Sequence, residues 1–168
     1  FIAFVLYGFL MTVRGAFTIG VEVASAERLI MMHKVSLIQL LPISYEQQIR
    51  STPGVVAATH STWFGGTYKD LANQFAVMAV DPTPFMDMYP EFKISEADKK
   101  QWLSDRQGAI VGRDTANRYG WKVGDRVPIN GTIWQPKQGE TWFFNISAIY
   151  DGDKAVDKTT FYFRYDYL

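Results

Sequence analysis

The chain has 168 residues, with 17 Lys and Arg balanced by 17 Asp and Glu, no cysteine, and 48% hydrophobic residues. This length suits one domain with a sizeable core, and the apolar content argues against a disordered chain. The zero net charge, with no run of more than two basic residues, argues against nucleic-acid binding, and the lack of cysteine excludes disulfides and thiolate metal sites.

The N-terminal segment is apolar. Residues 1–13 read FIAFVLYGFLMTV, and only Arg14 interrupts before the uncharged stretch 15–21. A buried core helix is one alternative, but it would carry a polar stripe, and a signal peptide is another, but it would follow a basic region. Thirteen helical residues rise ~20 Å, less than the ~30 Å core of a bilayer. We expect residues 1–21 to be the outer end of a transmembrane helix, whose membrane-embedded side chains include Phe1, Phe4, Leu6, Phe9 and Leu10.

Short strands and helices are expected from residue 22 onward. Residues 28–34 read as a strand, or as a helix that continues from the membrane segment. Ser44 is placed to cap a helix over 45–50, which Pro53-Gly54 ends. Residues 55–61 and 74–80 read as two strands on either side of a loop at Gly65-Gly66.

The second half of the chain carries clearer signals. A short helical turn is expected at 84–88, and Ser95 with Asp98 resembles a capping box that starts a helix to about residue 105. A strand at 109–111 and a helix at 113–119 ended by Gly120 follow, and Gly124 turns the chain into a strand that reaches residue 129. Residues 142–150 alternate with period two and predict one apolar face, made of Trp142, Phe144, Ile146, Ala148 and Tyr150.

The last segment, 159–167, is an aromatic strand that runs to the chain end. Such a strand needs a neighbour on at least one edge and a covered face, yet nothing follows it. We therefore expect a piece of a larger membrane protein. Residues 1–21 would be the remnant of a first transmembrane helix, and residues 22–168 an extracytoplasmic domain truncated at its C-terminus.

Signatures of catalysis and metal binding are missing from the sequence. It has no phosphate-binding GxxxxGK[ST] loop, no GxGxxG, no GxSxG and no HExxH motif. His33 and His60 fall in predicted strands and are too few for a zinc site, which uses three or four ligands. Asp151, Asp153 and Asp157 lack calcium-loop spacing and a closing Glu, so they read as a solvated turn. We expect no catalytic residue, metal or cofactor.

Trp63 and Phe64 are the candidate contact with a partner. Trp often anchors interfaces, and the following Gly65-Gly66 pair would allow a protruding loop. The alternative is that Trp63 folds back over the core.

The order of these elements resembles a known family. The segments that carry the likeness read YEQQIRSTPGVVAATHSTWFGG, FAVMAVDPTPFMDMYPEF, GAIVGRDTANRYGWKVGDRVPI and WFFNISAIYD. Together they resemble the MacB-like periplasmic core domain of ABC-transporter permeases in the FtsX and MacB superfamily. The likeness spans nearly the whole chain and is most telling at 108–129 and 144–151. These are packing and turn features, so they indicate fold better than substrate.

The resemblance implies an α+β (mixed α/β) domain of strand-helix-strand units, preceded by a transmembrane helix in the bacterial inner membrane and facing the periplasm or cell exterior. Such domains relay ATP-driven motion to export or extract a substrate or to control a partner. The implied partners are a cytoplasmic ABC ATPase subunit, a second permease subunit, the lipid bilayer, and a periplasmic adaptor or substrate. No catalytic residue carries over, because the family's domain is mechanical.

Two rival functions remain open at this stage. A ligand-sensing extracytoplasmic domain of a membrane receptor would also show a hydrophobic helix before a mixed α/β module. A secreted enzyme would need a catalytic constellation, and the sequence offers none.

Overall fold

The computed structural model describes residues 7, 28–36, 39–137, 139 and 141–168. Its contacts divide the chain into two units, Phe1–Met32 and His33–Leu168. The predicted membrane helix at 1–21 lies outside the described residues except for Tyr7, which is helical and exposed. The predicted domain boundary between residues 21 and 22 also lies outside them. Among the described residues, no helix is both long enough and apolar enough to cross a bilayer.

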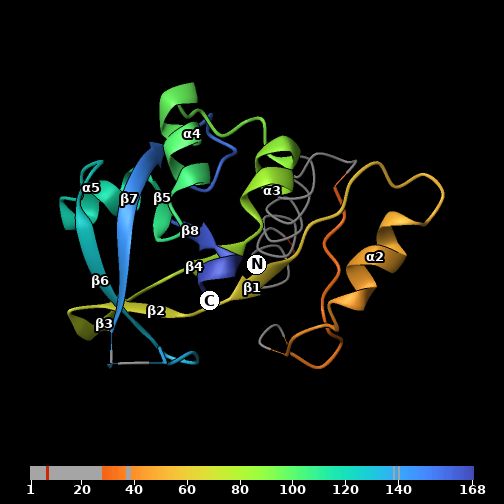
Figure 1. Ribbon diagram of the computed structural model, residues 1–168, viewed down its shortest axis with the longest axis horizontal. Coiled ribbons are helices and arrows are strands. Elements are labelled where there is room, and N and C mark those ends of the chain that lie inside the picture. Colours follow the sequence, from red (N-terminus) through yellow and green to blue (C-terminus); the bar gives the residue numbers. More distant parts are fainter. Residues whose placement is uncertain (1–6, 8–27, 37–38, 138, 140) are drawn as a thin grey trace. The chain divides into compact units, whose positions relative to one another are not determined.

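Residues 33–60, which we call the strap, lead into the sheet and carry helix α2 (Ser44–Arg50). Figure 1 shows α2 standing away from the strands, and none of its residues is buried. The predicted cap at Ser44 is wrong, because Ile43 is the N-cap and makes no side-chain capping bond, so Ser44 is already helical. The helix ends as predicted before Gly54, whose φ of 91° suits a residue without a side chain.

Two predicted strands do not form. Residues 28–34 are irregular, and of residues 55–61 only Ser61 joins the sheet. Leu29 is 93% exposed and Val56 is fully exposed, and Ala58 is the one buried residue among residues 55–60. The β-branched and apolar residues supply strand propensity, but a strand also needs a partner on its edge and a surface to pack on.

Within the described residues, eight strands form one curled sheet in the order β1-β4-β8-β5-β7-β6-β2-β3. The strands are β1 (Ser61–Trp63), β2 (Gly66–Tyr68), β3 (Asp70–Phe75), β4 (Val77–Val80), β5 (Gly108–Gly112), β6 (Arg126–Gly131), β7 (Trp142–Tyr150) and β8 (Phe161–Arg164). The pairs β4–β8 and β5–β7 are parallel, and the other pairs are antiparallel. The fold is therefore mixed α/β, as predicted.

One bent hairpin closes the curl of the sheet. Its register runs without a shift from Ser61↔Val80 to Thr67↔Gln74, and the Phe64 amide continues the ladder at the bend. Strands β1 and β2 are thus two halves of one strand, and β4 and β3 are the two halves of its partner. The β4 half pairs with β8 while the β2 half pairs with β6, so both ends of the sheet order belong to this hairpin.

Two glycines allow the hairpin to bend. Gly65 has a φ of 65°, a left-handed conformation that costs glycine little. A Cβ on Gly66 would lie 2.4 Å from Val77 Cγ2, so only glycine fits against the facing strand. The predicted loop at Gly65-Gly66 is therefore a bend inside a strand, and Gly66 is the first residue of β2.

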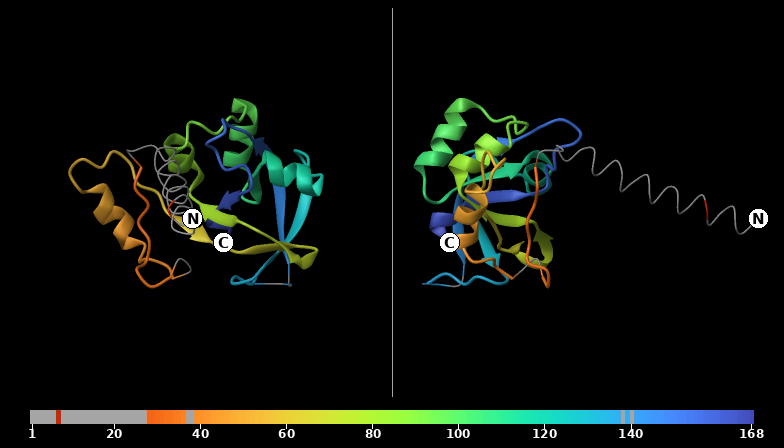
Figure 2. Two further views of the ribbon diagram at one scale, coloured as in Figure 1. Left: turned by 180° about the vertical axis from the view of Figure 1, so that it is seen from behind. Right: turned by 90° about the vertical axis from the view of Figure 1, so that its right-hand side faces the viewer.

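The curled sheet packs on two sides. Its inner side encloses a cluster of buried side chains that is rich in aromatic rings: Phe64, Val77, Ala79, Ala109, Val111, Val127, Ile129, Trp142, Phe144, Ile146, Phe161 and Phe163. Its other side holds a second cluster with residues from helices α3 (Pro82–Met88) and α4 (Glu96–Ser104), which cover that face in Figure 2. The members of this cluster are Val80, Phe85, Met86, Phe92, Trp102, Ile110, Ala148 and Tyr150.

Strand β7 serves both clusters because it changes face at Ser147. Ala109 pairs with Ile146 and Ile110 pairs with Ala148, which leaves Ser147 as the extra residue of a β-bulge. The prediction of a single apolar face over 142–150 is therefore wrong, although all five of its side chains are buried. The first three lie in the inner cluster, and the last two lie beneath α3 and α4.

The helix signals of the second half are confirmed. The hydroxyl of Ser95 accepts a hydrogen bond from the Asp98 amide at 3.1 Å and caps α4. Helix α5 (Arg113–Tyr119) ends at Gly120, whose φ is 71°. Helix α3 starts at Pro82, two residues earlier than expected, because Asp81 is its N-cap.

The aromatic strand near the chain end has neighbours on both edges. Strand β8 lies between β4 and β5 and ends at Arg164, and a 3-10 turn, η1 (Tyr165–Tyr167), follows it. The sequence argument that this strand lacks a partner is wrong, because its partners come from earlier in the chain.

Candidate interaction site

The candidate contact residues Trp63 and Phe64 face opposite environments. Phe64 is fully buried at the centre of the inner cluster. Its ring meets those of Trp142, Phe144 and Phe163 edge to face, with centroid distances of 5.7, 6.2 and 5.1 Å. Its side chain therefore anchors the bent hairpin and has no surface to offer a partner.

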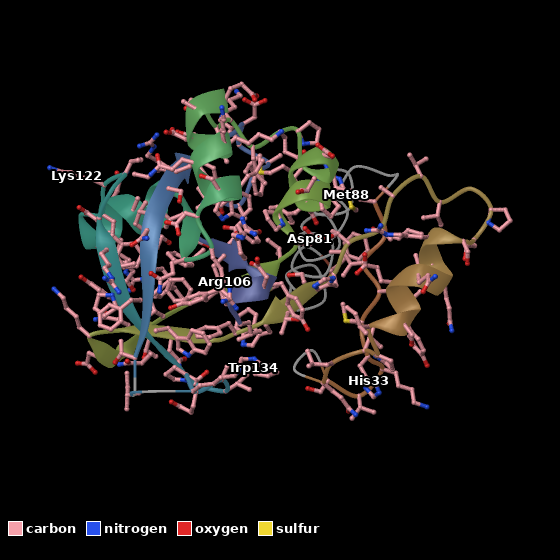
Figure 3. The ribbon with its side chains drawn as sticks, viewed as in Figure 1. His33, Asp81, Met88, Arg106, Lys122 and Trp134 are labelled. Atoms are coloured by element: carbon pink, nitrogen blue, oxygen red, sulfur yellow. The ribbon has the colours of Figure 1, made fainter. Side chains whose placement is uncertain are left out.

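Trp63 remains available at the rim of the sheet. Its side chain is 37% exposed, and its indole lies over Gly65, where an added Cβ would be 3.1 Å from the indole nitrogen. Trp134 Nε1 donates to the Trp63 carbonyl at 3.1 Å, and Trp142 Nε1 donates to the Trp134 carbonyl at 3.0 Å. These two hydrogen bonds attach Trp134, which Figure 3 labels, to β1 and β7.

We call Trp63, Ile133 and Trp134 the tryptophan rim. Ile133 is 40% exposed beside the half-buried Trp134, so the rim presents apolar surface on a hydrogen-bonded frame. A rigid indole offers large contact area at low entropic cost, which suits an apolar patch on a partner. That Trp63 makes such a contact remains a prediction.

A cavity of 320 Å³ lies among the strap end, α3 and η1, and is lined by polar residues: His60, Asp81, Thr83, Arg164, Tyr165 and Asp166, with Pro82 and Leu103. Its charged groups already have partners. Arg164 pairs with Asp166 at 2.7 Å and also donates to the Leu103 carbonyl. The hydrogen bond from Arg164 holds the pKa of Asp166 below its ordinary value. The Asp81 carboxylate accepts from the Thr83 amide at 3.4 Å and caps α3.

The two histidines occupy different settings. Both were predicted to lie in strands, and neither does. His33 Nδ1 accepts from the Val35 amide at 3.3 Å on the exposed strap, where Figure 3 labels it. His60 Nδ1 lies 2.6 Å from Glu46 Oε2. Over the described ranges, no group of three His, Cys, Asp or Glu side chains is arranged to hold a metal ion.

The acidic loop after β7 is held by local partners. Asp151 accepts from the Gly152 amide at 2.8 Å and pairs with Lys158 at 3.0 Å, and these contacts lower its pKa to about 2. Asp153 pairs with Lys93 at 2.5 Å. This arrangement fits the predicted solvated turn, because neighbouring cations and amides satisfy the carboxylates.

Sequence reasoning missed the contact that joins the strap to the sheet. Glu46 of α2 reaches His60, and the His60 ring meets Tyr165 of η1 edge to face at a centroid distance of 4.4 Å. The only sequence signal was one polar ring at the end of the apolar run 55–60. Its partners are 14 residues earlier and 105 residues later in the numbering, so spacing could not identify them.

No family model and no curated protein matches the chain. Among solved structures, it is similar to a domain of a predicted permease protein from Porphyromonas gingivalis, with 15% identity and a TM-score of 0.48. That match covers 74% of this chain and 52% of the other, so the chain spans about half the length of that structure. It is also similar to the extracellular domain of the noncanonical ABC-type transporter YknZ from Gram-positive bacteria, with 11% identity and a TM-score of 0.48. This second match covers 81% of this chain and 70% of the other.

Proposed function

We propose that the chain is the extracytoplasmic domain of an ABC-transporter permease subunit in the bacterial inner membrane. In this role it relays ATP-driven conformational change outward, to export or extract a substrate or to control a partner. The domain is mechanical and catalyses no reaction. ATP hydrolysis belongs to a separate cytoplasmic subunit, and a second permease subunit completes the transporter.

The observation that carries the proposal is the unit from β5 to β7. The sequence segments that most resemble the permease family, 108–129 and 144–151, fall on β5, α5, β6 and β7, which pack together as one strand-helix-strand unit. The family likeness therefore coincides with a folded unit and not with scattered turns.

The positions of the large and the charged side chains also support a mechanical role. The largest buried side chains of the domain lie in the two clusters that pack on the sheet. In the 320 Å³ cavity, Arg164 pairs with Asp166, and Asp81 caps α3. A body with a packed interior deforms little, so it can pass a displacement from one side to the other.

The first test is topology together with partnership. Lys100 is exposed on α4, so a cysteine introduced there in the full-length protein should react in intact cells with a maleimide that cannot cross membranes. Purification from the same cells should retain an ATP-binding subunit. The protein without the added cysteine controls for background labelling. Protection of the cysteine in intact cells, or purification without any ATP-binding subunit, would contradict the proposal.

The second test concerns the tryptophan rim. Replacing Trp63 with Ala in the full-length protein should reduce transport, or control of the partner, at unchanged protein level, while Leu71→Ala at another exposed apolar position should not. Equal activity of the two variants would show that Trp63 is not part of the proposed contact. The permease assignment would not be affected, because the topology test decides it separately.

A further inference from the structure

In the described part of the strap, His60 contacts both helix α2 and the turn that follows β8. Helix α2 buries no residue, and Ile43, Tyr45 and Val56 are exposed, whereas Ala58, two residues before His60, is buried. His60 is the last residue before β1 and is only partly exposed. Its side chain contacts the strap on one side and η1 on the other.

The strap side of this contact is built to detach without unfolding the helix. Glu46 uses Oε2 for His60 at 2.6 Å and Oε1 for Arg50 at 2.7 Å. The Glu46–Arg50 pair is spaced i,i+4, so it supports α2 whether or not His60 is bound. Arg50 also donates to the Ala58 carbonyl at 2.8 and 3.1 Å, which closes residues 50–58 into a loop. Residues 46–58 are therefore held together by contacts of their own.

The sheet side of the contact is fixed. Tyr165 lies in η1 and contacts the His60 ring. Two residues later in the same turn, the Tyr167 hydroxyl donates to the Phe143 carbonyl of β7 at 3.1 Å. Arg106 donates two hydrogen bonds to the Asp166 carbonyl, so the loop after α4 holds the same turn. His60 therefore joins a detachable strap to an anchored turn.

From this geometry we propose that Glu46, His60 and Tyr165 form a latch that docks the strap on the sheet and opens as a unit. His60 donates from Nδ1 to the Glu46 carboxylate and stacks its ring edge against Tyr165, and loss of either contact frees the strap. If the chain is a permease domain, as proposed above, the latch couples motion that reaches the strap to the sheet. The latch itself is a property of the folded chain and can be tested without a transporter.

The test uses distances between two spin labels in the full 168-residue chain. Because the sequence has no cysteine, labels on Gln48→Cys of α2 and Lys100→Cys of α4, both exposed, report without background. We expect one narrow distance distribution for the parent. In His60→Ala the undocked population should rise about threefold or more, as expected for the loss of a charge-assisted hydrogen bond at a partly exposed site.

Matched variants separate the latch from a general loss of structure. Glu46→Ala should broaden the distribution like His60→Ala, and the double variant should add nothing further, because both changes break one contact. His60→Gln should restore the narrow distribution, since its amide can donate to Glu46. Tyr165→Ala should broaden the distribution and Tyr165→Phe should not. His33→Ala controls for the loss of a strap histidine.

A thermal melt of each variant shows whether the sheet remains folded. If His60→Ala lowers the Tm of the sheet sharply, the distances of Glu46→Ala are used in its place, because Glu46 lies on the strap and outside the sheet. An unchanged distribution in both His60→Ala and Glu46→Ala, with the sheet folded, would overturn the latch. That result would leave the permease proposal standing, and failure of the topology test would leave the latch standing.

Discussion

The curled sheet and the strap use their apolar residues in opposite ways. In the sheet, the large side chains of β4, β5, β7 and β8 are divided between two buried clusters. In the strap, Val35, Ile43, Tyr45 and Val56 are exposed, and α2 has no buried residue. A body held by packing resists deformation, whereas a segment held by a few polar contacts opens at low cost. One domain therefore combines a packed sheet with a strap whose helix has no buried residue.

The largest expected effect of a single change is on the bent hairpin. Phe64→Ala should lower the free energy of unfolding by about 4 kcal/mol, because it leaves a cavity among three aromatic rings. Tyr45→Ala, on the strap, should change it by about 0.5 kcal/mol or less. Urea denaturation of both variants measures the difference. Equal losses would mean that the strap is packed as firmly as the sheet.

Gly112 and Gly54 allow the backbone of the sheet to be compared with that of the strap. Gly112 ends β5 against the Lys158 carbonyl, and an added Cβ would lie 2.0 Å from that oxygen. Gly112→Ala should therefore cost about 3 kcal/mol through overpacking. Gly54→Ala on the strap meets no atom within 4 Å and should cost only about 1 kcal/mol, from its positive φ. Thermal melts of the two variants should rank them in this order, and the reverse order would contradict the account.

Two valines sharpen the comparison with identical chemistry. Val77 is fully buried between the hairpin and the core, while Val56 is fully exposed. Val77→Ala should lower the free energy of unfolding by about 2 kcal/mol, and Val56→Ala should leave it within about 0.5 kcal/mol. A measurable loss in Val56→Ala alone would show that residues 55–60 are covered in solution.

The smallest expected effect is the dependence of sheet stability on acid. The Gly152 amide and Lys158 lower the pKa of Asp151 to about 2 in the folded chain, below the ordinary carboxyl value. Because the folded-state pKa is lowered, this contribution is present above about pH 4 and is lost as the pH falls toward 2. The parent should be more stable than Asp151→Asn at neutral pH, and unfolding curves measured down to pH 2 should show the difference shrinking. A difference that stays constant across this range would contradict the pairing.

Local sequence signals located several elements correctly, although the cap predicted at Ser44 was wrong. Ser95 and Gly120 bound their helices by local capping, and the alternation of 142–150 marked β7 to the residue. They failed where a partner far along the chain decides. Residues 70–75 include Asp70 and Asn73, which favour turns, yet pairing with β2 makes them β3.

The candidate site was also only partly predictable from the sequence. The sequence identified Trp63 as an aromatic residue near a glycine pair, but it could not separate it from Phe64, whose burial depends on Trp142, Phe144 and Phe163. The contacts of His60 were hidden for the same reason, since Glu46 and Tyr165 meet it only in the folded chain. Long-range packing, and not residue type, decides these positions.

Under the proposed function, the strap passes motion to the sheet in response to ATP. If the chain is the permease domain proposed above, the full-length protein assembled with an ATP-binding subunit and labelled at Gln48→Cys and Lys100→Cys tests this by the distance between the labels with and without trapped ATP. We predict that the strap-to-sheet distance changes with nucleotide, while a control pair within the folded body, Lys100→Cys and the exposed Lys122→Cys, keeps its distance. Identical distances for the strap pair in both nucleotide states would contradict the account.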